Sequence, residues 1–349
     1  MSVANLNKPY IDLEHSLTKG DLDVVHLKRM WCRAMRDRSG IPADAKREDE
    51  WALDNVIYHG LSLPIEETIQ FLYQIAPSFA EFEKWVLERN GGTLNKNTLD
   101  RINVTIEGLL SGSSRSRSND RAERLLTAAD MDRWNKDGYV VVSGLYSPKE
   151  VDEAEHAVWE HLGMNPEDAD TWYGHPRDHG IMVQFFDHPA LNAIRESAKA
   201  RCVFAELWGS TDLWVSKDRV SFNPPERTGH EFPGPRLHWD VSLELPIPFG
   251  VQGLVYLTDT IADQGAFTCV PGFHNRIENW MNDLPKGVDP RSENIEKLGA
   301  VPIPGKAGDL VIWHQALPHG SRPNRSTRPR IVQYITMFPA AAAYAGSWK

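Results

Sequence analysis

The sequence has few cysteines, no long apolar run and no excess of positive charge. Three cysteines in 349 residues, none in a C-x-x-C pair, exclude a disulfide framework and a cysteine-built zinc site. No segment has the length and apolarity of a membrane span, and the N-terminus lacks the basic and apolar regions of a secretory signal. A formal net charge of -10 argues against a protein whose main task is to hold nucleic acid, because phosphate binding needs clustered Lys and Arg. We therefore expect a cytoplasmic protein with reduced cysteines, with neither nucleic acid nor a membrane as its partner.

The overall composition is that of a globular protein, but one short segment contains only polar residues and glycine. The stretch SGSSRSRSND, residues 111–120, contains no apolar residue and is typical of a flexible linker. A role for it in nucleic-acid binding or as a phosphorylation target is the less favoured alternative, since two arginines make a weak electrostatic site. The sequence therefore predicts a domain over residues 1–110, a Ser/Arg-rich linker over 111–125 and a second domain over 126–349.

The first predicted domain has helical patterns throughout. Between Val24 and Met35 apolar residues recur at helical intervals, and Gly40 is a suitable C-terminal cap. A second helix is expected in IEETIQFLYQI, a third from the capping box of Ser78 and Glu81 to about residue 90, and a fourth in TLDRINVTIEGLL. We expect this α-helical domain to be a scaffold or a homo-oligomerisation element, with a lid or recognition module as the alternative.

The second predicted domain has the pattern of a mainly β protein with flanking helices. It opens with a helix (LTAADMDRWNKDG), a strand (YVVVSGLY) and a second helix capped by Ser147, with Pro148 in its first turn and Glu150 completing the box. From about residue 200, short β runs alternate with Gly/Pro turns, which is typical of a barrel or jelly roll. These runs are DLWVSKDRVSF, FGVQGLVYLTD, GAFTCVPG, GAVPIPGKAGDLVIWH and RPRIVQYITMFP.

A pair of polar residues lies at the entrance of a β run, in PRLHWDVSLEL. In a strand, His238 and Asp240 share one face and Trp239 points away. A His and a carboxylate are two of the three ligands of a facial triad, whose open positions favour non-heme Fe(II). Later in the chain, GDLVIWHQALPHGS offers His314 or His319 as the third ligand. H-x-D alone is a weak signal, since such a pair is more often hydrogen-bonded at the surface.

Several motifs, in order along residues 126–339, resemble the phytanoyl-CoA dioxygenase family of Fe(II)/2-oxoglutarate-dependent oxygenases. GYVVVSGLYSPKEVDEAE is similar to the opening strand and helix of that family, and GAFTCVPGFH is similar to its G-A-L-x-x-x-P-G-S-H turn. GDLVIWHQALPHGSRPNRSTRPR is similar to its closing segment. The resemblance implies a double-stranded β-helix, a jelly-roll or cupin-like fold, for the catalytic domain. It also implies Fe(II) as the metal, with 2-oxoglutarate and O2 as cosubstrates.

The resemblance also assigns roles to residues of this chain. His238, Asp240 and His319 match the catalytic metal ligands of the family, Arg330 the arginine that binds the 5-carboxylate of 2-oxoglutarate, and Ser321 a serine that touches that carboxylate. A guanidinium suits this role because it stays charged and can bind a carboxylate through two hydrogen bonds. Arg328 is the alternative, but it precedes a proline and lies nearer the turn.

The chain departs from the family pattern in three places. Trp239 stands where the family usually has Gln, so packing replaces any hydrogen bond from that side chain. The turn reads PGFH rather than PGSH, which leaves the role of Phe273 open. The helical segment before the linker is not required by the family core, so the resemblance does not assign it a function.

Other polar and aromatic residues are candidates for the surroundings of the site. WYGHPRDHG and IMVQFFDHP fall where relatives place substrate contacts, and the loop NPPERTGHEFPGPR runs into His238. We expect His314 in the pocket or core, His274 as a structural hydrogen-bond partner, and His175 and His179 in a loop. The predicted substrate-pocket residues are Trp172, Tyr173, Gln184 and Arg236, with Arg227 as a further anion-binding candidate; core packing and solvated loop charges are the simpler alternatives.

We therefore predict a dioxygenase that hydroxylates an unactivated C–H bond of a small metabolite, amino-acid-derived or a natural-product intermediate, and releases succinate and CO2. Asp240 favours hydroxylation over halogenation, because halogenating relatives have a small residue there; desaturation and ring formation stay open. One alternative is a non-oxidative metal-binding cupin-like isomerase or binding module, which has no need of Arg330. The other is an oxygenase acting on a carrier- or CoA-tethered substrate with help from the N-terminal helices. The lack of a broad Lys/Arg cluster favours a free small molecule.

Overall fold

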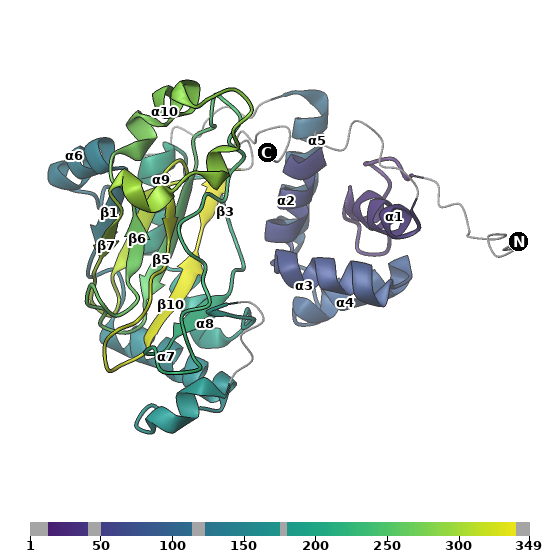
Figure 1. The fold of residues 1–349 in the computed structure, drawn as a ribbon. Helices are drawn as coiled ribbons and strands as arrows, with labels where there is room; N and C mark the ends of the chain where they lie inside the picture. Colours follow the sequence, from purple (N-terminus) through teal and green to yellow (C-terminus); the bar gives the residue numbers. More distant parts are fainter. Residues whose placement is uncertain (1–12, 41–49, 114–122, 175–179, 340–349) are drawn as a thin grey trace, which may run out of the picture. The chain divides into compact units, whose positions relative to one another are not determined.

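A computed structural model describes residues 13–40, 50–113, 123–174 and 180–339. The described residues up to 113 form one compact unit and those from 123 onward form another (Figure 1). Residues 114–122, which make up most of the predicted linker, lie outside the described residues. No helix within the described ranges combines the length and apolarity that crossing a membrane requires.

The first unit contains helices and no strand within its described residues. Ser78 and Glu81 form the predicted capping box at the start of one helix, each side chain bonding the main chain of the other residue. One helix was not predicted, because its residues from Leu53 to Gly60 are all buried, including the polar Asp54 and His59, so no solvent-facing polar side marks it. The elements are α1 (Leu27–Arg38), α2 (Trp51–Gly60), α3 (Ile65–Gln70) continuing into the π-helical turn η2 (Phe71–Ile75), α4 (Phe79–Arg89) and α5 (Lys96–Ser111).

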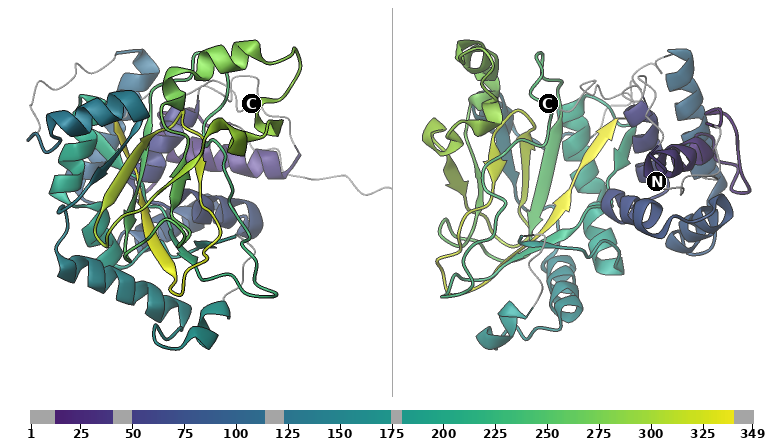
Figure 2. Two further views of the ribbon diagram at one scale, coloured as in Figure 1. Left: turned by 60° about the vertical axis from the view of Figure 1, so that its left-hand side comes forward. Right: turned by 45° about the vertical axis from the view of Figure 1, so that its right-hand side comes forward.

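The second unit is built around an antiparallel sheet, which Figure 2 shows from two further sides. This sheet has six strands in the order β1-β8-β5-β10-β4-β2. A three-stranded antiparallel sheet, β7-β6-β9, and a two-stranded pair, β11-β3, complete the β structure. This confirms the predicted antiparallel β architecture. The strands are β1 (Tyr139–Val142), β2 (Met182–Val183), β3 (Leu213–Val215), β4 (Val220–Asn223), β5 (Val251–Tyr256), β6 (Phe267–Cys269), β7 (Val301–Ile303), β8 (Leu310–His314), β9 (His319–Gly320), β10 (Arg330–Ile335) and β11 (Met337–Pro339).

Helices surround this β structure. The predicted cap of α7 is confirmed, with Ser147 and Glu150 in a capping box and Pro148 in the first turn. The helices are α6 (Ala128–Asp137), α7 (Pro148–Leu162), α8 (Pro189–Arg195), α9 (Ala198–Trp208) and α10 (Ile277–Asp283), with short 3-10 turns η3 (Ala169–Tyr173), η4 (Phe273–Asn275), η5 (Pro290–Ser292) and η6 (Ile295–Leu298).

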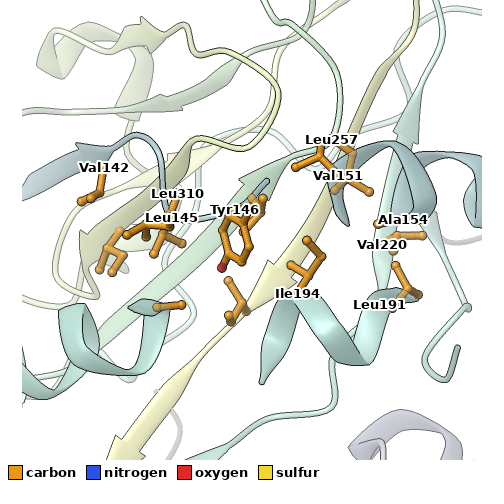
Figure 3. Close-up of a cluster of buried hydrophobic side chains, with 14 of the residues drawn as sticks. Val142, Leu145, Tyr146, Val151, Ala154, Leu191, Ile194, Val220, Leu257 and Leu310 are labelled. Carbon is orange, nitrogen blue, oxygen red and sulfur yellow. The ribbon is translucent and has the colours of Figure 1, made fainter. Parts of the chain in front are cut away.

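The two faces of the six-stranded sheet have different neighbours. In β8, Leu310 and Ile312 belong to one buried cluster, whereas Val311 and Trp313 belong to another, as alternation along a strand requires. Figure 3 shows the first cluster, in which α7 and α8 place Val151, Ala154, Leu191 and Ile194 against the sheet. The second cluster includes Phe267 of β6 and Ile303 of β7, so this face of the large sheet is covered by the small one. Polar side chains on the second face therefore point between two β layers.

Candidate metal and cosubstrate site

Three predicted residues meet in one cluster between the β layers. One ligand atom from each of His238, Asp240 and His319 lies within 4.8 Å of the others. Main-chain hydrogen bonds bring the two histidines together, because His238 and His319 form an antiparallel bridge with N–H···O distances of 2.8 Å and 2.9 Å. His319 begins β9, but His238 and Asp240 lie in irregular chain outside the named strands. The expected strand at the H-x-D pair is therefore wrong, although both side chains do lie on one side, as predicted.

Each imidazole is held by its other nitrogen. His238 Nδ1 lies 2.7 Å from the Arg236 carbonyl oxygen, and His319 Nδ1 lies 3.1 Å from that of Leu317. A carbonyl only accepts, so each Nδ1 carries a proton. Without a metal, a protonated Nε2 can also donate to Asp240, and loss of that proton frees the Nε2 lone pair for a metal. His238 Nε2 lies 3.2 Å from Asp240 Oδ1, and His319 Nε2 lies 3.1 Å from Asp240 Oδ2. Two neutral imidazoles and one carboxylate are a donor set that suits a divalent metal such as iron.

The protonation behaviour of the cluster follows from these contacts. Burial by itself raises the pKa of Asp240, but hydrogen bonds with His238 and His319 outweigh burial and hold that pKa well below its usual range. Burial lowers the pKa of His238, yet its contact with Asp240 prevails and the net pKa is raised. Asp240 is therefore a carboxylate at neutral pH, ready to act as an anionic ligand.

A glutamine and a tryptophan that the sequence did not single out hold the Asp240 carboxylate. Gln252 Nε2 donates to Asp240 Oδ2 at 2.9 Å, and Trp313 Nε1 donates to Gln252 Oε1 at 3.1 Å. The indole N–H only donates, so it fixes which end of the Gln252 amide faces Asp240. Gln252 in β5 and Trp313 in β8 are directly paired residues, and their contact is set by sheet register.

Trp239 points away from the cluster, as predicted. Its side chain is 2% exposed, packs near Phe273 and Trp280, and donates from Nε1 to the Ala316 carbonyl oxygen at 3.0 Å. Phe273, the second departure from the family pattern, is fully buried in the same cluster. Both departures therefore add packing behind the metal ligands.

A buried arginine contacts Ser321, two residues after His319 in the chain, and has no acidic partner among the described residues. Arg330, the first residue of β10, is 0% exposed. It donates from Nη1 to Ser221 Oγ at 3.0 Å and from Nη2 to Ser321 Oγ at 3.1 Å, while Nε has no hydrogen-bond partner. Across the described ranges, no carboxylate forms an ion pair with it. A buried guanidinium without a counter-ion is costly, so the arrangement suits an incoming carboxylate.

Arg328, Ser321 and Ser221 differ in their exposure and in their contacts with Arg330. Arg328 is exposed and donates from Nη1 to the Pro166 carbonyl oxygen at 3.1 Å. It therefore lacks the burial that distinguishes Arg330. Ser321 is 6% exposed and accepts a hydrogen bond from Arg330, and its contact with the carboxylate of 2-oxoglutarate stays a prediction. Ser221 of β4 was not predicted, because nothing in VSFN distinguishes it before β4 and β10 are paired.

A cavity opens beside the His238, Asp240 and His319 cluster. Ser321 and Gln252 also face it, together with aromatic side chains of β6, β8 and β10. Asp218 and Arg219, which precede β4, are charged members of its wall that the sequence did not indicate. The described lining residues are Met182, Asp218, Arg219, Pro235, His238, Asp240, Gln252, Gly253, Phe267, Trp313, His319, Gly320, Ser321, Tyr334 and Thr336.

The four predicted substrate-pocket residues are not among the described residues of this wall. Trp172 and Tyr173 border a different hollow with Ile181 and Phe222, and Trp172 is 5% exposed. Gln184 is half-buried, and Arg236 is exposed, although its carbonyl oxygen holds His238. A substrate role for these four side chains stays a prediction. Arg227 stacks on the Tyr173 ring at 3.5 Å, away from this wall.

The remaining histidines do not join the cluster. The ring of His314 lies 5.2 Å from that of His274, and burial followed by the nearby His274 lowers the pKa of His314 to about 4. Burial likewise lowers the pKa of His274. His319, and not His314, lies in the cluster with His238 and Asp240, and its role as a metal ligand stays a prediction. His175 and His179 lie outside the described residues.

Comparisons with known proteins show which family the chain is similar to. The model of the phytanoyl-CoA dioxygenase (PhyH) family matches residues 134–332. A putative phytanoyl-CoA dioxygenase of Dictyostelium discoideum is 31% identical over 96 residues, which is 26% of this chain and 28% of that protein. An ectoine dioxygenase of Bordetella bronchiseptica is 24% identical over 59% of this chain and 73% of its own length. The crystal structure of the epimerase SnoN with Fe3+, alpha ketoglutarate and nogalamycin RO has a TM-score of 0.43 at 19% identity, covering 62% of this chain and 84% of that one.

The antiparallel β unit and its His-Asp-His cluster define the class of 2-oxoglutarate-dependent oxygenases. The chain belongs to the phytanoyl-CoA dioxygenase family. The predicted enzyme class, a 2-oxoglutarate-dependent dioxygenase that uses iron, is thereby confirmed.

Proposed function

We propose that this enzyme hydroxylates an unactivated C–H bond of a small metabolite, with His238, Asp240 and His319 holding Fe(II) and Arg330 holding 2-oxoglutarate. The observation that carries the proposal is that Ser321 links the metal cluster to the buried guanidinium of Arg330, which is itself not among the described residues of the cavity wall. A complete facial donor set lies beside Ser321, which in turn contacts a buried arginine that lacks an acidic partner. The donor set can bind a metal, and the arginine can bind one carboxylate of the 2-oxoglutarate dianion.

The chain's own residues prepare the site for both groups. The Nδ1 contacts of His238 and His319 keep the two Nε2 atoms directed inward, and Gln252 orients the Asp240 carboxylate. The side chains of Ser221 and Ser321 fix the guanidinium of Arg330 so that a carboxylate meets a rigid donor. When bound, iron supplies the activation of O2 that drives the decarboxylation of 2-oxoglutarate to succinate and CO2 and the oxidation of the substrate.

Arg330 also separates this function from its alternative. A non-oxidative metal site, such as a cupin-like isomerase, has no use for a buried cation that lacks a counter-ion. The free energy needed to bury that charge is offset if an anionic cosubstrate binds it during every turnover.

The test is oxygen-dependent succinate formation from 2-oxoglutarate with added Fe(II). We expect His319→Ala and Asp240→Ala to abolish turnover, because each removes one of three metal ligands. His156→Ala is the matched control, since this histidine lies on α7 with a side chain 73% exposed. The proposal is wrong if wild type and both ligand variants turn over 2-oxoglutarate at the same rate.

We also propose that the β unit is a double-stranded β-helix domain joined by the linker at 111–125 to a helical domain at 1–110, which mediates homo-oligomerisation. Sedimentation of the full chain and of a variant lacking residues 1–118 tests this second point. Equal assembly of the two proteins would contradict it. Unchanged substrate kinetics in the truncated protein would also exclude a role of these helices in presenting a tethered substrate.

A further inference from the structure

The cavity beside the metal cluster contains one acidic residue that the proposed chemistry does not use. Of the described lining residues, only Asp218 and Asp240 are acidic, and Asp240 belongs to the metal cluster. Asp218 is not part of the group that can share one metal ion. Asp218 therefore lines the space that remains for the substrate without being committed to the metal.

The main chain at Asp218 is held rigidly. Arg195 is 3% exposed and donates from Nη2 to the Asp218 carbonyl oxygen at 3.1 Å. The same guanidinium donates from Nη1 to the Phe186 carbonyl oxygen at 2.8 Å and to Asn192 Oδ1 at 2.7 Å. The chain then enters β4, which is paired with β10. Asp218 is thus placed by a buried anchor on one side and by the sheet on the other, as a recognition group must be.

The carboxylate of Asp218 keeps acceptor capacity toward the cavity. Oδ1 accepts the Arg219 N–H at 2.7 Å and lies 3.7 Å from Arg219 Nε, a loose contact between adjacent residues. Among the described residues, no donor reaches Oδ2. The side chain is 42% exposed although it lines a cavity. The net pKa of Asp218 is raised, chiefly by burial, so a cationic donor at the open oxygen would favour the ionised form of the carboxylate.

The surroundings make that open oxygen more attractive to a cation. Burial raises the pKa of Asp218, Arg219 lowers it, and the negative charge of Asp240 raises it further. A cationic group that binds here removes part of the cost that burial imposes on the carboxylate. Methionine, proline, tyrosine and threonine side chains of the same wall carry no charge and can cover the apolar part of a substrate.

We propose that Asp218 is the recognition residue for a positively charged nitrogen in the substrate, such as an ammonium or an amidinium group. The inference rests on the proposed function, because it places the substrate in the cavity beside the metal cluster. It narrows the substrate class to small cationic or zwitterionic metabolites. An anionic substrate group next to Asp218 is disfavoured, because Asp218 and Asp240 would repel it.

The experiment separates a small-molecule cell extract by charge. Fractions retained on a cation exchanger, retained on an anion exchanger or passing through both are added to wild-type enzyme with Fe(II), 2-oxoglutarate and O2. Succinate formation above the rate without extract is measured. The same fractions are then titrated into Asp218→Asn, with Asp132→Asn, an exposed acid of α6, as the matched control.

We expect stimulation by the fraction retained on the cation exchanger, with the half-saturating amount raised at least about tenfold in Asp218→Asn, the loss expected for a charge-assisted hydrogen bond. Metal affinity of the variant, titrated without oxygen, verifies that the cavity is intact. Stimulation by another fraction, no stimulation above measurable basal turnover, or equal titrations of variant and wild type would each overturn the proposal. Absence of any turnover, basal or stimulated, would instead contradict the proposed dioxygenase function.

Discussion

Replacing Gln252 with alanine should weaken metal binding although Gln252 is not a metal ligand. The substitution removes the 2.9 Å hydrogen bond to Asp240 Oδ2 and leaves Trp313 Nε1 without its acceptor. The Asp240 carboxylate is then free to rotate, so its two oxygens no longer keep fixed positions opposite the Nε2 atoms of His238 and His319. The apo site therefore loses the orientation that the metal requires.

The magnitude follows from the position of this contact. Loss of a hydrogen bond to a metal ligand costs about 10- to 100-fold in metal affinity, which corresponds to about 1.4 to 2.7 kcal/mol. Trp313→Phe keeps the packing of the ring against Phe267 and removes only the indole N–H. We expect its effect to be smaller, because Gln252 can still donate to Asp240 but no longer has a fixed amide orientation.

Anaerobic calorimetric titration with Fe(II) measures these affinities directly. Gln74→Ala is the matched control, since this glutamine is exposed in η2 of the other compact unit. The expected order of affinity is wild type and Gln74→Ala first, then Trp313→Phe, then Gln252→Ala. Equal affinities for Gln252→Ala and wild type would refute the claim that β5 orients the carboxylate.

Three further outcomes follow from the structure. Arg330→Lys should raise the KM for 2-oxoglutarate at least about tenfold, because lysine keeps the charge but cannot contact Ser221, Ser321 and a carboxylate at once; an unchanged KM would place the cosubstrate elsewhere. Trp239→Ala should lower the free energy of unfolding by about 3 to 5 kcal/mol in denaturant titrations, since it empties a buried site; a loss below about 1 kcal/mol would contradict this packing role. Burial lowers the pKa of His59 to about 3, so the unfolded chain binds its proton first, and stability should fall by about 1.4 kcal/mol per pH unit from about pH 6.5 toward pH 3. His59→Leu should remove this part of the pH dependence of unfolding, and an identical pH profile would show that His59 is not buried as a neutral group.

The order of the chemical motifs was readable along the chain. H-x-D, H-G-S and an arginine eleven residues later need no tertiary information to be found, because ligand chemistry restricts which residue types can serve. The capping boxes at Ser78 and Ser147 were equally readable, since a cap is a contact between residues three apart. Local spacing is sufficient wherever the interacting groups are close in sequence.

The tertiary structure decided what depends on pairing between distant segments. The position of His319, rather than His314, beside His238 follows from the bridge between them, and the burial of Arg330 follows from the pairing of β10 with β4. Gln252 and Trp313 meet because β5 and β8 are in register, and Arg195, distant in sequence, holds the main chain of Asp218 at the cavity wall. The sequence by itself determined the metal chemistry of this protein, because that chemistry depends on which residue types are present as ligands. The surroundings that orient the ligands and select the substrate were decided by the fold, because sheet register brings together residues that no spacing in the chain connects.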